Sequence, residues 1–216
     1  MRPSSSIVLG LLLVAMAPGW AAETATEVRI TAELRSLTVK HKGQAVTIER
    51  AQDPASTIDA DYAKTSRPCP PFCIQPATLA PGVETIGELE LLQYLKRANE
   101  GDASVLVVDS RTPDWVEKGT IPGSVNIPWK TLSPEAGADP LAIAETLERR
   151  FGARSQEGLW DFSDAKTLVL FCNGPWCAQS PTNIRTLLKF GYPAHLLKWY
   201  RGGLQDWHAL GLTVVK

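Results

Sequence analysis

Histidine is scarce in this chain of 216 residues, where only His41, His195 and His208 occur. None of the three stands in an obvious pair with a cysteine, so the sequence gives no sign of a Cys-His catalytic pair. Excess charge is lacking as well. The formal net charge is -1, which leaves no electrostatic footprint for nucleic acid or an anionic membrane surface. We therefore expect no nucleic-acid partner.

Apolar runs long enough to cross a bilayer, which takes about 20 residues, are also missing. Residues 7–17 form an apolar run of eleven residues that follows the basic Arg2 and ends at Pro18. A small-x-small sequence comes next, and no cysteine stands there to carry a lipid. This pattern is typical of a secretory signal peptide. We predict a signal peptide over residues 1–21 and a mature protein without a membrane span, exported most simply to a bacterial periplasm.

Cysteines are few, and export makes their pairing important. The four are Cys69, Cys73, Cys172 and Cys177. They allow three pairings, of which 69–73 with 172–177 is the simplest. For the CPPFC sequence, three interpretations stay open: a structural disulfide, a redox pair that acts with Cys172, or a soft-metal site. Two thiolates without a nearby histidine or methionine make a poor metal site, so we predict neither a metal nor a cofactor.

Three regions follow the predicted signal peptide. Residues 22–50 contain two alternating runs around Gly43, which indicate a small N-terminal β-hairpin extension. Residues 51–82 are rich in proline and small polar residues, and we predict a proline-rich linker or a long ordered loop that carries CPPFC. Residues 83–216 alternate between helical and strand patterns, and we predict one domain there.

Within the last region, residues 104–109, 167–171 and 195–200 are apolar runs of strand length. Helical patterns lie at 85–97, 139–152, 180–191 and 203–211. Thr85 and Glu88 have the spacing of a capping box, and Asp139 precedes Pro140 as an N-cap. Buried strands that alternate with helices predict an α/β fold, a parallel sheet with helices on both faces.

Cys172 directly follows the predicted strand at 167–171, at the carboxyl edge where such sheets form their sites. Loop amides and the dipole of the following helix both favour a thiolate there, and the thiolate is the nucleophilic form. The predicted loop around this sulfur consists of Asn173, Gly174, Pro175, Trp176 and Cys177. Trp176 is placed to form a wall of the entrance or to shield the sulfur.

Two further stretches carry a resemblance to a known family. VLVVDSRTPDWVEKGTIPGSVNIP (residues 105–128) resembles the first signature of rhodanese-like domains. LKWYRGGLQDWHALGLTVV (residues 197–215) is similar to the closing signature of that family, and Cys172 falls where the family carries its catalytic cysteine. The resemblance covers residues 83–216 and implies the rhodanese-like fold.

The resemblance implies a sulfurtransferase. Cys172 would take a sulfane sulfur from a donor such as thiosulfate, and a thiol or cyanide-type acceptor would discharge the persulfide. Residues 173–177 would hold the persulfide. Asp109 and Arg111 would brace the loop, whereas Lys189, Lys198 and Arg201 are candidates for positive charge near it.

Other functions stay open at this point. Cys172 and Cys177 could work as a thiol-disulfide pair or sulfur relay with a periplasmic redox partner, with Cys69 and Cys73 as a second pair. An inactive binding module is a third interpretation. A cysteine phosphatase is disfavoured, because its loop needs an arginine six residues after the cysteine and Ala178 stands there.

Overall fold

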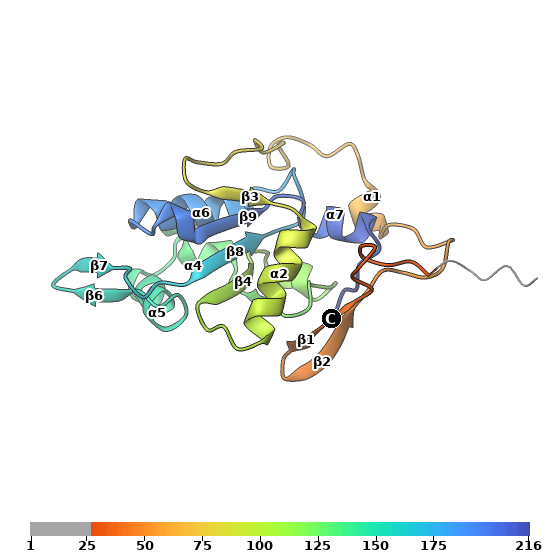
Figure 1. Cartoon of the computed structure of the whole chain (residues 1–216). Helices are drawn as coiled ribbons and strands as arrows, with labels where there is room; N and C mark the ends of the chain where they lie inside the picture. Colours follow the sequence, from red (N-terminus) through yellow and green to blue (C-terminus); the bar gives the residue numbers. More distant parts are fainter. Residues whose placement is uncertain (1–26) are drawn as a thin grey trace, which may run out of the picture.

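A sheet of five parallel strands forms the centre of the computed structural model, which describes residues 27–216 (Figure 1). The predicted signal peptide lies outside the described residues. In spatial order the strands are β3 (Glu84–Ile86), β9 (Leu197–Tyr200), β8 (Thr167–Phe171), β4 (Val105–Asp109) and β5 (Val125–Asn126). Each neighbouring pair runs parallel. The predicted parallel α/β architecture is confirmed.

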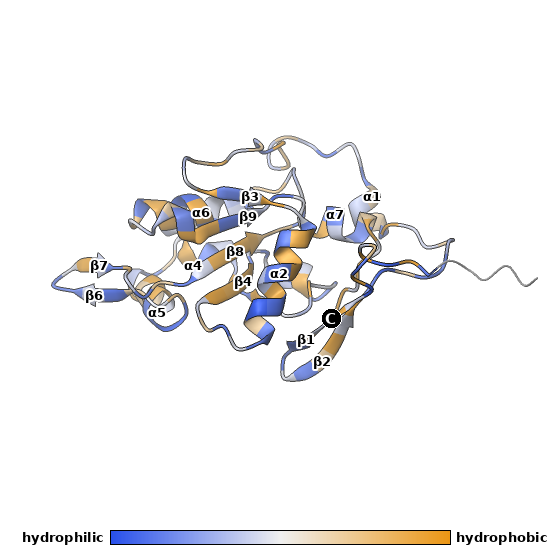
Figure 2. Ribbon diagram, viewed as in Figure 1, coloured by the Kyte–Doolittle hydropathy of each residue, from blue (hydrophilic) through white to orange (hydrophobic). Residues whose placement is uncertain are grey.

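Helices cover both faces of this sheet because β8 alternates its apolar side chains between them. Val169 and Phe171 join one buried cluster, and Leu168 and Leu170 join another. The first cluster receives α2 (Glu88–Asn99) and α7 (Gly203–Ala209), and the second receives α5 (Pro140–Arg149) and α6 (Gln179–Lys189), with α4 (Trp129–Leu132) beside them. Figure 2 shows the hydrophobic colour concentrated on β4 and β8 between these layers.

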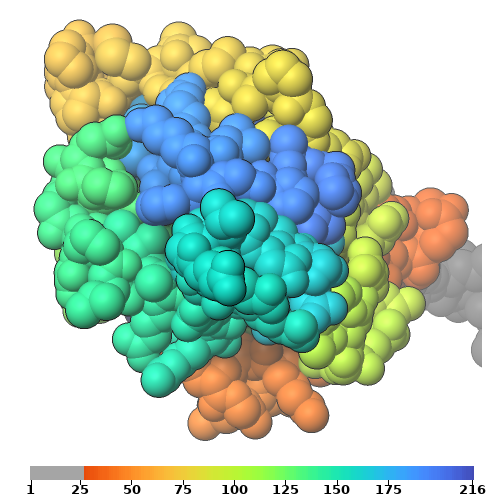
Figure 3. Space-filling view, turned by 90° about the vertical axis from the view of Figure 1, so that its left-hand side faces the viewer, coloured from red at the N-terminus to blue at the C-terminus, as the bar shows by residue number. Residues whose placement is uncertain are grey.

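Shorter elements fill the connections. They are α1 (Ala60–Ala63), α3 (Pro113–Val116), η1 (Pro134–Ala136) and η2 (Ala194–Leu196), together with a second hairpin of β6 (Arg154–Gln156) and β7 (Leu159–Asp161). This second hairpin, which faces the viewer in Figure 3, was not predicted. Within residues 27–216, no helix combines the length and the apolar character that crossing a membrane requires.

The N-terminal hairpin is confirmed, with β1 (Leu37–His41) antiparallel to β2 (Gln44–Ile48). Its two turn residues have φ of 50° and 83°, and the second is Gly43, for which this conformation costs little. Val39 and Ile48 are buried in the same cluster as Leu95 of α2. A hairpin alone is barely stable, and this one gains its stability by packing on the domain.

One predicted helix start is wrong. Thr85 does not cap a helix with Glu88, because Thr85 lies in β3 opposite Trp199 of β9. The helix α2 begins three residues later, after Gly87, whose N–H donates to Glu90 Oε2 at 3.0 Å. The start of α5 is confirmed, since Asp139 accepts a hydrogen bond from the N–H of Leu141 at 3.1 Å.

Residues 59–76, here called the strap, lie within the stretch predicted to be a linker. The strap contains α1, and Figure 1 shows this helix beside α7. Tyr62 of α1 is only 4% exposed and stacks on His208 of α7, with ring centroids 4.6 Å apart. Further along, the N–H of Gln75 donates to Pro175 O at 2.8 Å. The strap is therefore anchored to the domain at both of its ends.

Candidate functional site

The site begins where β8 ends, at Phe171. Cys172 follows directly, and residues 173–178 form a loop that leads to α6 at Gln179. The loop is tied to α7, because Cys172 O and Asn173 O accept hydrogen bonds from Leu204 N and Gln205 N at 3.0 and 2.9 Å. Gly203 permits this approach: its φ is 57°, and a Cβ there would lie 2.3 Å from Cys172 O. The strand end thus fixes the position of the cysteine.

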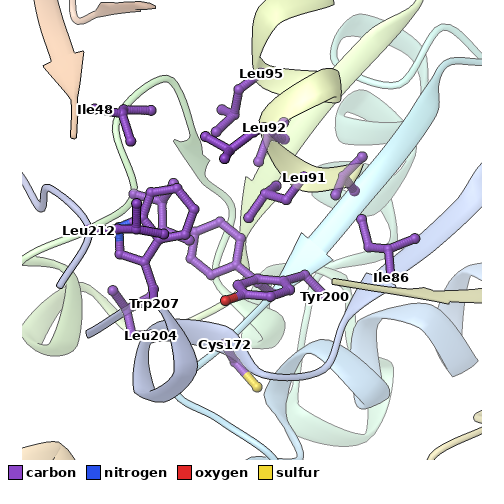
Figure 4. Close-up of a cluster of buried hydrophobic side chains, with 14 of the residues drawn as sticks. Ile48, Ile86, Leu91, Leu92, Leu95, Cys172, Tyr200, Leu204, Trp207 and Leu212 are labelled. Carbon is purple, nitrogen blue, oxygen red and sulfur yellow. The ribbon is translucent and has the colours of Figure 1, made fainter. Parts of the chain in front are cut away.

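The sulfur of Cys172 is buried, with 2% of the residue exposed, and free of any disulfide. Figure 4 shows it at the edge of the first cluster, turned away from the ring of Tyr200. Ser180 Oγ donates to this sulfur at 3.1 Å, and Trp199 Nε1 donates to Ser180 Oγ at 3.1 Å. Because Trp199 occupies a lone pair of the hydroxyl, the Ser180 hydrogen is left to point at the sulfur.

Burial by itself would raise the pKa of Cys172. Hydrogen bonds from the Cys177 thiol, the Ser180 hydroxyl and the amides of Ser180 and Gly174 act in the opposite direction, and the pKa of Cys172 lies below its usual value. The sulfur is therefore stabilised as a thiolate by side-chain and backbone donors together. A thiolate in this setting is a nucleophile.

Cys177 is the second free thiol of the loop and is 4% exposed. Burial and the neighbouring Cys172 sulfur raise the pKa of Cys177 well above its usual value, so it keeps its proton while Cys172 loses its own. Of the simplest predicted pairing, the Cys69–Cys73 disulfide is confirmed. The second bond is not present, because Cys172 and Cys177 are both thiols.

Arg111 and Asp109 form an ion pair beneath the loop, with Nη2 2.6 Å from Asp109 Oδ2 and the Arg111 side chain fully buried. Burial would lower the pKa of Arg111, but its bonds to Asp109 raise it, so the guanidinium stays charged. Arg111 Nη1 donates to Asn173 Oδ1 at 3.3 Å, and Thr120 Oγ1 donates to Asp109 Oδ2 at 2.7 Å. The pair therefore connects β4 to the loop, and the bracing role stays a prediction.

Tyr62 of the strap completes this network. Its hydroxyl accepts from Arg111 Nη1 at 3.0 Å and donates to Asn173 Oδ1 at 3.2 Å. Burial raises the pKa of Tyr62 to about 12, so the hydroxyl remains a donor at neutral pH. With Asp109, Gly119 and Tyr62 as its partners, Arg111 is fully occupied and is not free to bind an anionic substrate.

Trp176 connects the loop to the strap. The guanidinium of Arg67 lies 3.6 Å from the centre of the Trp176 ring, and Phe72 meets that ring edge-on with centroids 5.6 Å apart. Trp176 Nε1 donates to Gln205 Oε1 at 2.6 Å, which fixes the indole from the side of α7. Strap, loop and α7 therefore meet at this one residue.

A cavity of about 270 Å³ adjoins the loop. Its lining residues are Pro71, Phe72, Trp115, Trp129, Asn173, Trp176, Cys177, Ala178, Gln179 and Thr182. Cys172 is not among them, whereas Cys177 lines the cavity and also hydrogen-bonds to the Cys172 sulfur. Cys177 therefore contacts both the cavity and that sulfur.

The three cationic residues predicted as candidates for the site have other partners. Lys189 Nζ lies 2.6 Å from Glu135 Oε1, and Lys198 Nζ lies 2.7 Å from Glu84 Oε2. Arg201 Nη2 donates to Gln75 O at 2.8 Å and so holds the strap. None of them lines the cavity. Among residues 27–216, no group of three or more histidine, cysteine or carboxylate side chains is arranged to hold a metal ion.

Several residues of the site carry no signal in the sequence. Ser180 stands at a predicted helix start, where its hydroxyl is expected to cap the helix, yet it donates to Cys172. Tyr62 and Phe72 are isolated aromatic residues in a polar, proline-rich stretch, and only their tertiary contacts bring them to the loop.

Comparison with known proteins adds a family. A family model described as a rhodanese-like domain matches residues 91–210, which is more than half of the 216 residues. No curated protein matches the chain.

Three solved structures illustrate the similarity of this chain to known folds. The human single-domain sulfurtransferase TSTD1 is 21% identical, with 58% of this chain and 95% of that chain covered and a TM-score of 0.34. The rhodanese-like domain of an Anabaena sp. protein is 15% identical, with coverages of 63% and 80% and a TM-score of 0.38. A Rhodopseudomonas palustris protein of unknown function, described as a possible tyrosine phosphatase, is 22% identical, with coverages of 62% and 85% and a TM-score of 0.40.

The family model decides the assignment. It spans β4, the Cys172 loop and α7, and it agrees with the two signatures seen in the sequence. The chain therefore belongs to the family of rhodanese-like domain proteins.

Proposed function

We propose that this protein is an exported sulfurtransferase that moves a sulfane sulfur through a persulfide on Cys172. One observation carries the proposal: a buried sulfur whose pKa is lowered by four hydrogen-bond donors, at the end of a central strand. The rhodanese-like family supports the same chemistry. The sequence of residues 1–21 supports export, and a periplasmic location is part of the proposal.

The reaction has two steps. In the first, the Cys172 thiolate attacks the outer sulfur of a thiosulfate-type donor. The sulfur–sulfur bond of the donor breaks, and sulfite leaves with the electron pair. In the second, a thiol or cyanide-type acceptor attacks the outer persulfide sulfur and returns Cys172 as a thiolate. The donors from Ser180 and Gly174 that favour the thiolate also favour the anionic persulfide.

Access to the sulfur requires a local movement. Cys172 is buried and does not line the cavity, whereas Cys177 does, and the proposal includes a rotation of the Cys177 side chain that admits the donor molecule. A cysteine is small, and a rotation about χ1 is enough to swing its sulfur aside. The proton that Cys177 retains is available to the leaving group.

The test is transfer itself. Treatment with thiosulfate is expected to add one sulfur atom to the peptide that carries Cys172, as seen by mass spectrometry, and cyanide is expected to remove it as thiocyanate. Cys172→Ala should show neither event, and Cys177→Ala should show both. A persulfide found only on Cys177 would overturn the assignment of the nucleophile.

A second candidate function rests on the contact between the two thiols. Because the Cys177 thiol hydrogen-bonds to Cys172, it is placed to attack the inner persulfide sulfur, expel hydrosulfide and leave a Cys172–Cys177 disulfide. Such a disulfide, cycled by a dithiol reductant, would identify a redox relay in place of a transferase. A protein that forms neither a persulfide nor this disulfide would be an inactive binding module.

A further inference from the structure

The cavity beside the loop has an unusual chemical character for a site that handles a small anion. Four of its ten lining residues are aromatic, and a proline adds to the apolar wall. No acidic or basic side chain is among these ten residues. A dianion such as thiosulfate would lose hydration on entry without gaining a charge partner from these walls.

The strap contributes part of the wall. Phe72 and Pro71 line the cavity from the strap, opposite residues that come from the loop and from α6. The Cys69–Cys73 disulfide brackets both residues, and Gln75 is fixed to Pro175 by a 2.8 Å hydrogen bond. These strap residues lie outside the region 91–210 that the family model matches. The strap thus adds Phe72 and Pro71 to a wall whose other aromatic residues, Trp115, Trp129 and Trp176, lie within the matched domain.

The size of the cavity suits a ring. A cavity of about 150 Å³ is large enough to take up benzene when its walls are apolar. The 270 Å³ available here would hold a ring together with a sulfur-containing substituent. Aromatic side chains also favour a flat partner, because they stack on it or meet it edge-on.

We propose that the cavity selects an aromatic organosulfur compound as the sulfur donor, and that Phe72 is a specificity-determining residue. This inference rests on the proposed sulfurtransferase function. The ring of the donor packs against Phe72, Trp129 and Trp176, and its sulfane sulfur faces the loop at Cys177. An arylthiosulfonate is a suitable probe: the Cys172 thiolate attacks its outer sulfur, the sulfur–sulfur bond breaks, and an arylsulfinate leaves with the electron pair.

A matched pair of donors isolates the ring. Benzenethiosulfonate and methanethiosulfonate carry the same single charge and the same reacting sulfur. Rates of persulfide formation on Cys172 are measured for both and divided by their rates with free cysteine in solution. We expect the corrected rate to favour the aromatic donor by about tenfold, the effect of burying a ring. Equal corrected rates would overturn the proposal.

Variants locate the effect in the wall. Phe72→Ala is expected to remove most of the preference, so that the ratio of the two corrected rates, both measured on the variant, falls to within about twofold of one. Ile74→Ala is the control, since Ile74 belongs to the same strap but is 82% exposed and does not line this cavity. Trp129→Leu provides a second wall variant should Phe72→Ala disturb the strap. A preference unchanged in both wall variants would contradict the assignment.

Binding of the leaving group separates this inference from the proposed function. Calorimetry on Cys172→Ala compares benzenesulfinate with methanesulfinate, and we expect at least about tenfold tighter binding of the aromatic anion. If the aromatic anion binds preferentially but the wild type forms no persulfide, the proposed sulfurtransferase function is contradicted and the proposed aromatic site is supported. If the wild type forms the persulfide but the aromatic anion does not bind preferentially, the sulfurtransferase function is supported and the aromatic site is contradicted.

Discussion

The two cysteine pairs of this protein look alike in sequence but differ in covalent state, in burial and in their place in the fold. Cys69 and Cys73 flank two prolines and a phenylalanine, and Cys172 and Cys177 flank a short loop that also contains proline and an aromatic residue. The first pair is bonded and lies in the strap, where Cys69 is exposed. The second pair is free and buried at the end of β8. Surroundings, more than spacing, set the state of a cysteine.

The difference extends to what holds each loop in place. The first loop is closed by its own covalent bond, and the second by hydrogen bonds from residues around it. Ser180, Gly174 and Cys177 donate to Cys172, and Arg111 holds Asn173 from below. Loss of the first pair should therefore weaken the fold, whereas loss of the second should abolish chemistry. The predictions below test this division.

The largest effect is expected from the nucleophile. Cys172→Ala should lower thiosulfate:cyanide sulfurtransferase activity by more than about 10³-fold, because the remaining free thiol, Cys177, has a raised pKa and is a poor nucleophile. Cys177→Ala should retain activity within about tenfold. The steady-state rates of the two variants test this prediction, and their unfolding curves check that both variants fold. Equal losses in both variants would mean that the two sulfurs act as one redox unit.

The buried ion pair below the second loop comes next. Arg111→Met leaves the Asp109 carboxylate buried without its charge partner and should lower the free energy of unfolding by about 3–5 kcal/mol. Urea unfolding measures this loss. Arg149→Met is the matched control, since Arg149 pairs with Glu145 on the exposed surface of α5, and a change within about 0.5 kcal/mol is expected there. Similar losses in the two variants would contradict the structural role of the buried pair.

Removal of the strap disulfide should cost less. The double variant Cys69→Ser/Cys73→Ser releases a loop with a sequence separation of 4, for which chain entropy predicts a loss of about 2 kcal/mol. Urea unfolding of the wild type in excess dithiol should give the same loss. The Cys172→Ser/Cys177→Ser variant keeps the Cys69–Cys73 bond and should lose stability in dithiol as the wild type does, whereas Cys69→Ser/Cys73→Ser should not respond. An equal response to dithiol in both double variants would contradict the comparison.

The smallest effect concerns the pH dependence of the thiolate. The pKa of Cys172 lies below its usual value, so its thiolate persists to lower pH than that of an ordinary cysteine and is lost as the pH falls through the lowered pKa. Ser180→Ala removes one donor and should move the titration to higher pH. Ultraviolet absorbance of the thiolate follows it directly, and Cys172→Ala identifies the signal.

A neighbouring hydroxyl provides the control for that titration. Thr182 lies on the same helix but donates to Ala178 O, not to the sulfur. Thr182→Ala should leave the titration of Cys172 where it is. A shift of equal size in both variants would show that the helix as a whole, and not the Ser180 hydroxyl, sets the pKa of Cys172.

Much of the domain could be predicted because its signals are local. β4 and β8 are continuous apolar runs that only a doubly covered strand explains, and Cys172 follows one of them directly. Asp139 and Pro140 mark a helix start by short-range chemistry. In contrast, Thr85 fits a helix cap just as well as a strand, and its pairing with Trp199, more than a hundred residues away, decided the outcome.

The rest of the site depends on tertiary contacts that produce no periodic hydrophobic pattern in the sequence. Nothing in the sequence around Tyr62 or Phe72 distinguishes a flexible linker from a strap that packs on the Cys172 loop. The exposed residues of β6 and β7 likewise lack the alternation that predicts strands. The oxidation state of each cysteine pair was also undetermined, since it depends on which neighbours surround the sulfur.

The joining of the N-terminal hairpin to the last residues of the chain has a consequence for biosynthesis. Ala51 N donates to Gly211 O at 2.7 Å, and Arg50 Nε donates to Leu210 O, so these contacts span about 160 positions. As the chain emerges N-terminus first, they form last. Cys69 and Cys73 emerge early, and 99 positions separate Cys73 from Cys172. The order of emergence would therefore let the first two sulfurs join in an oxidising compartment before Cys172 arrives there.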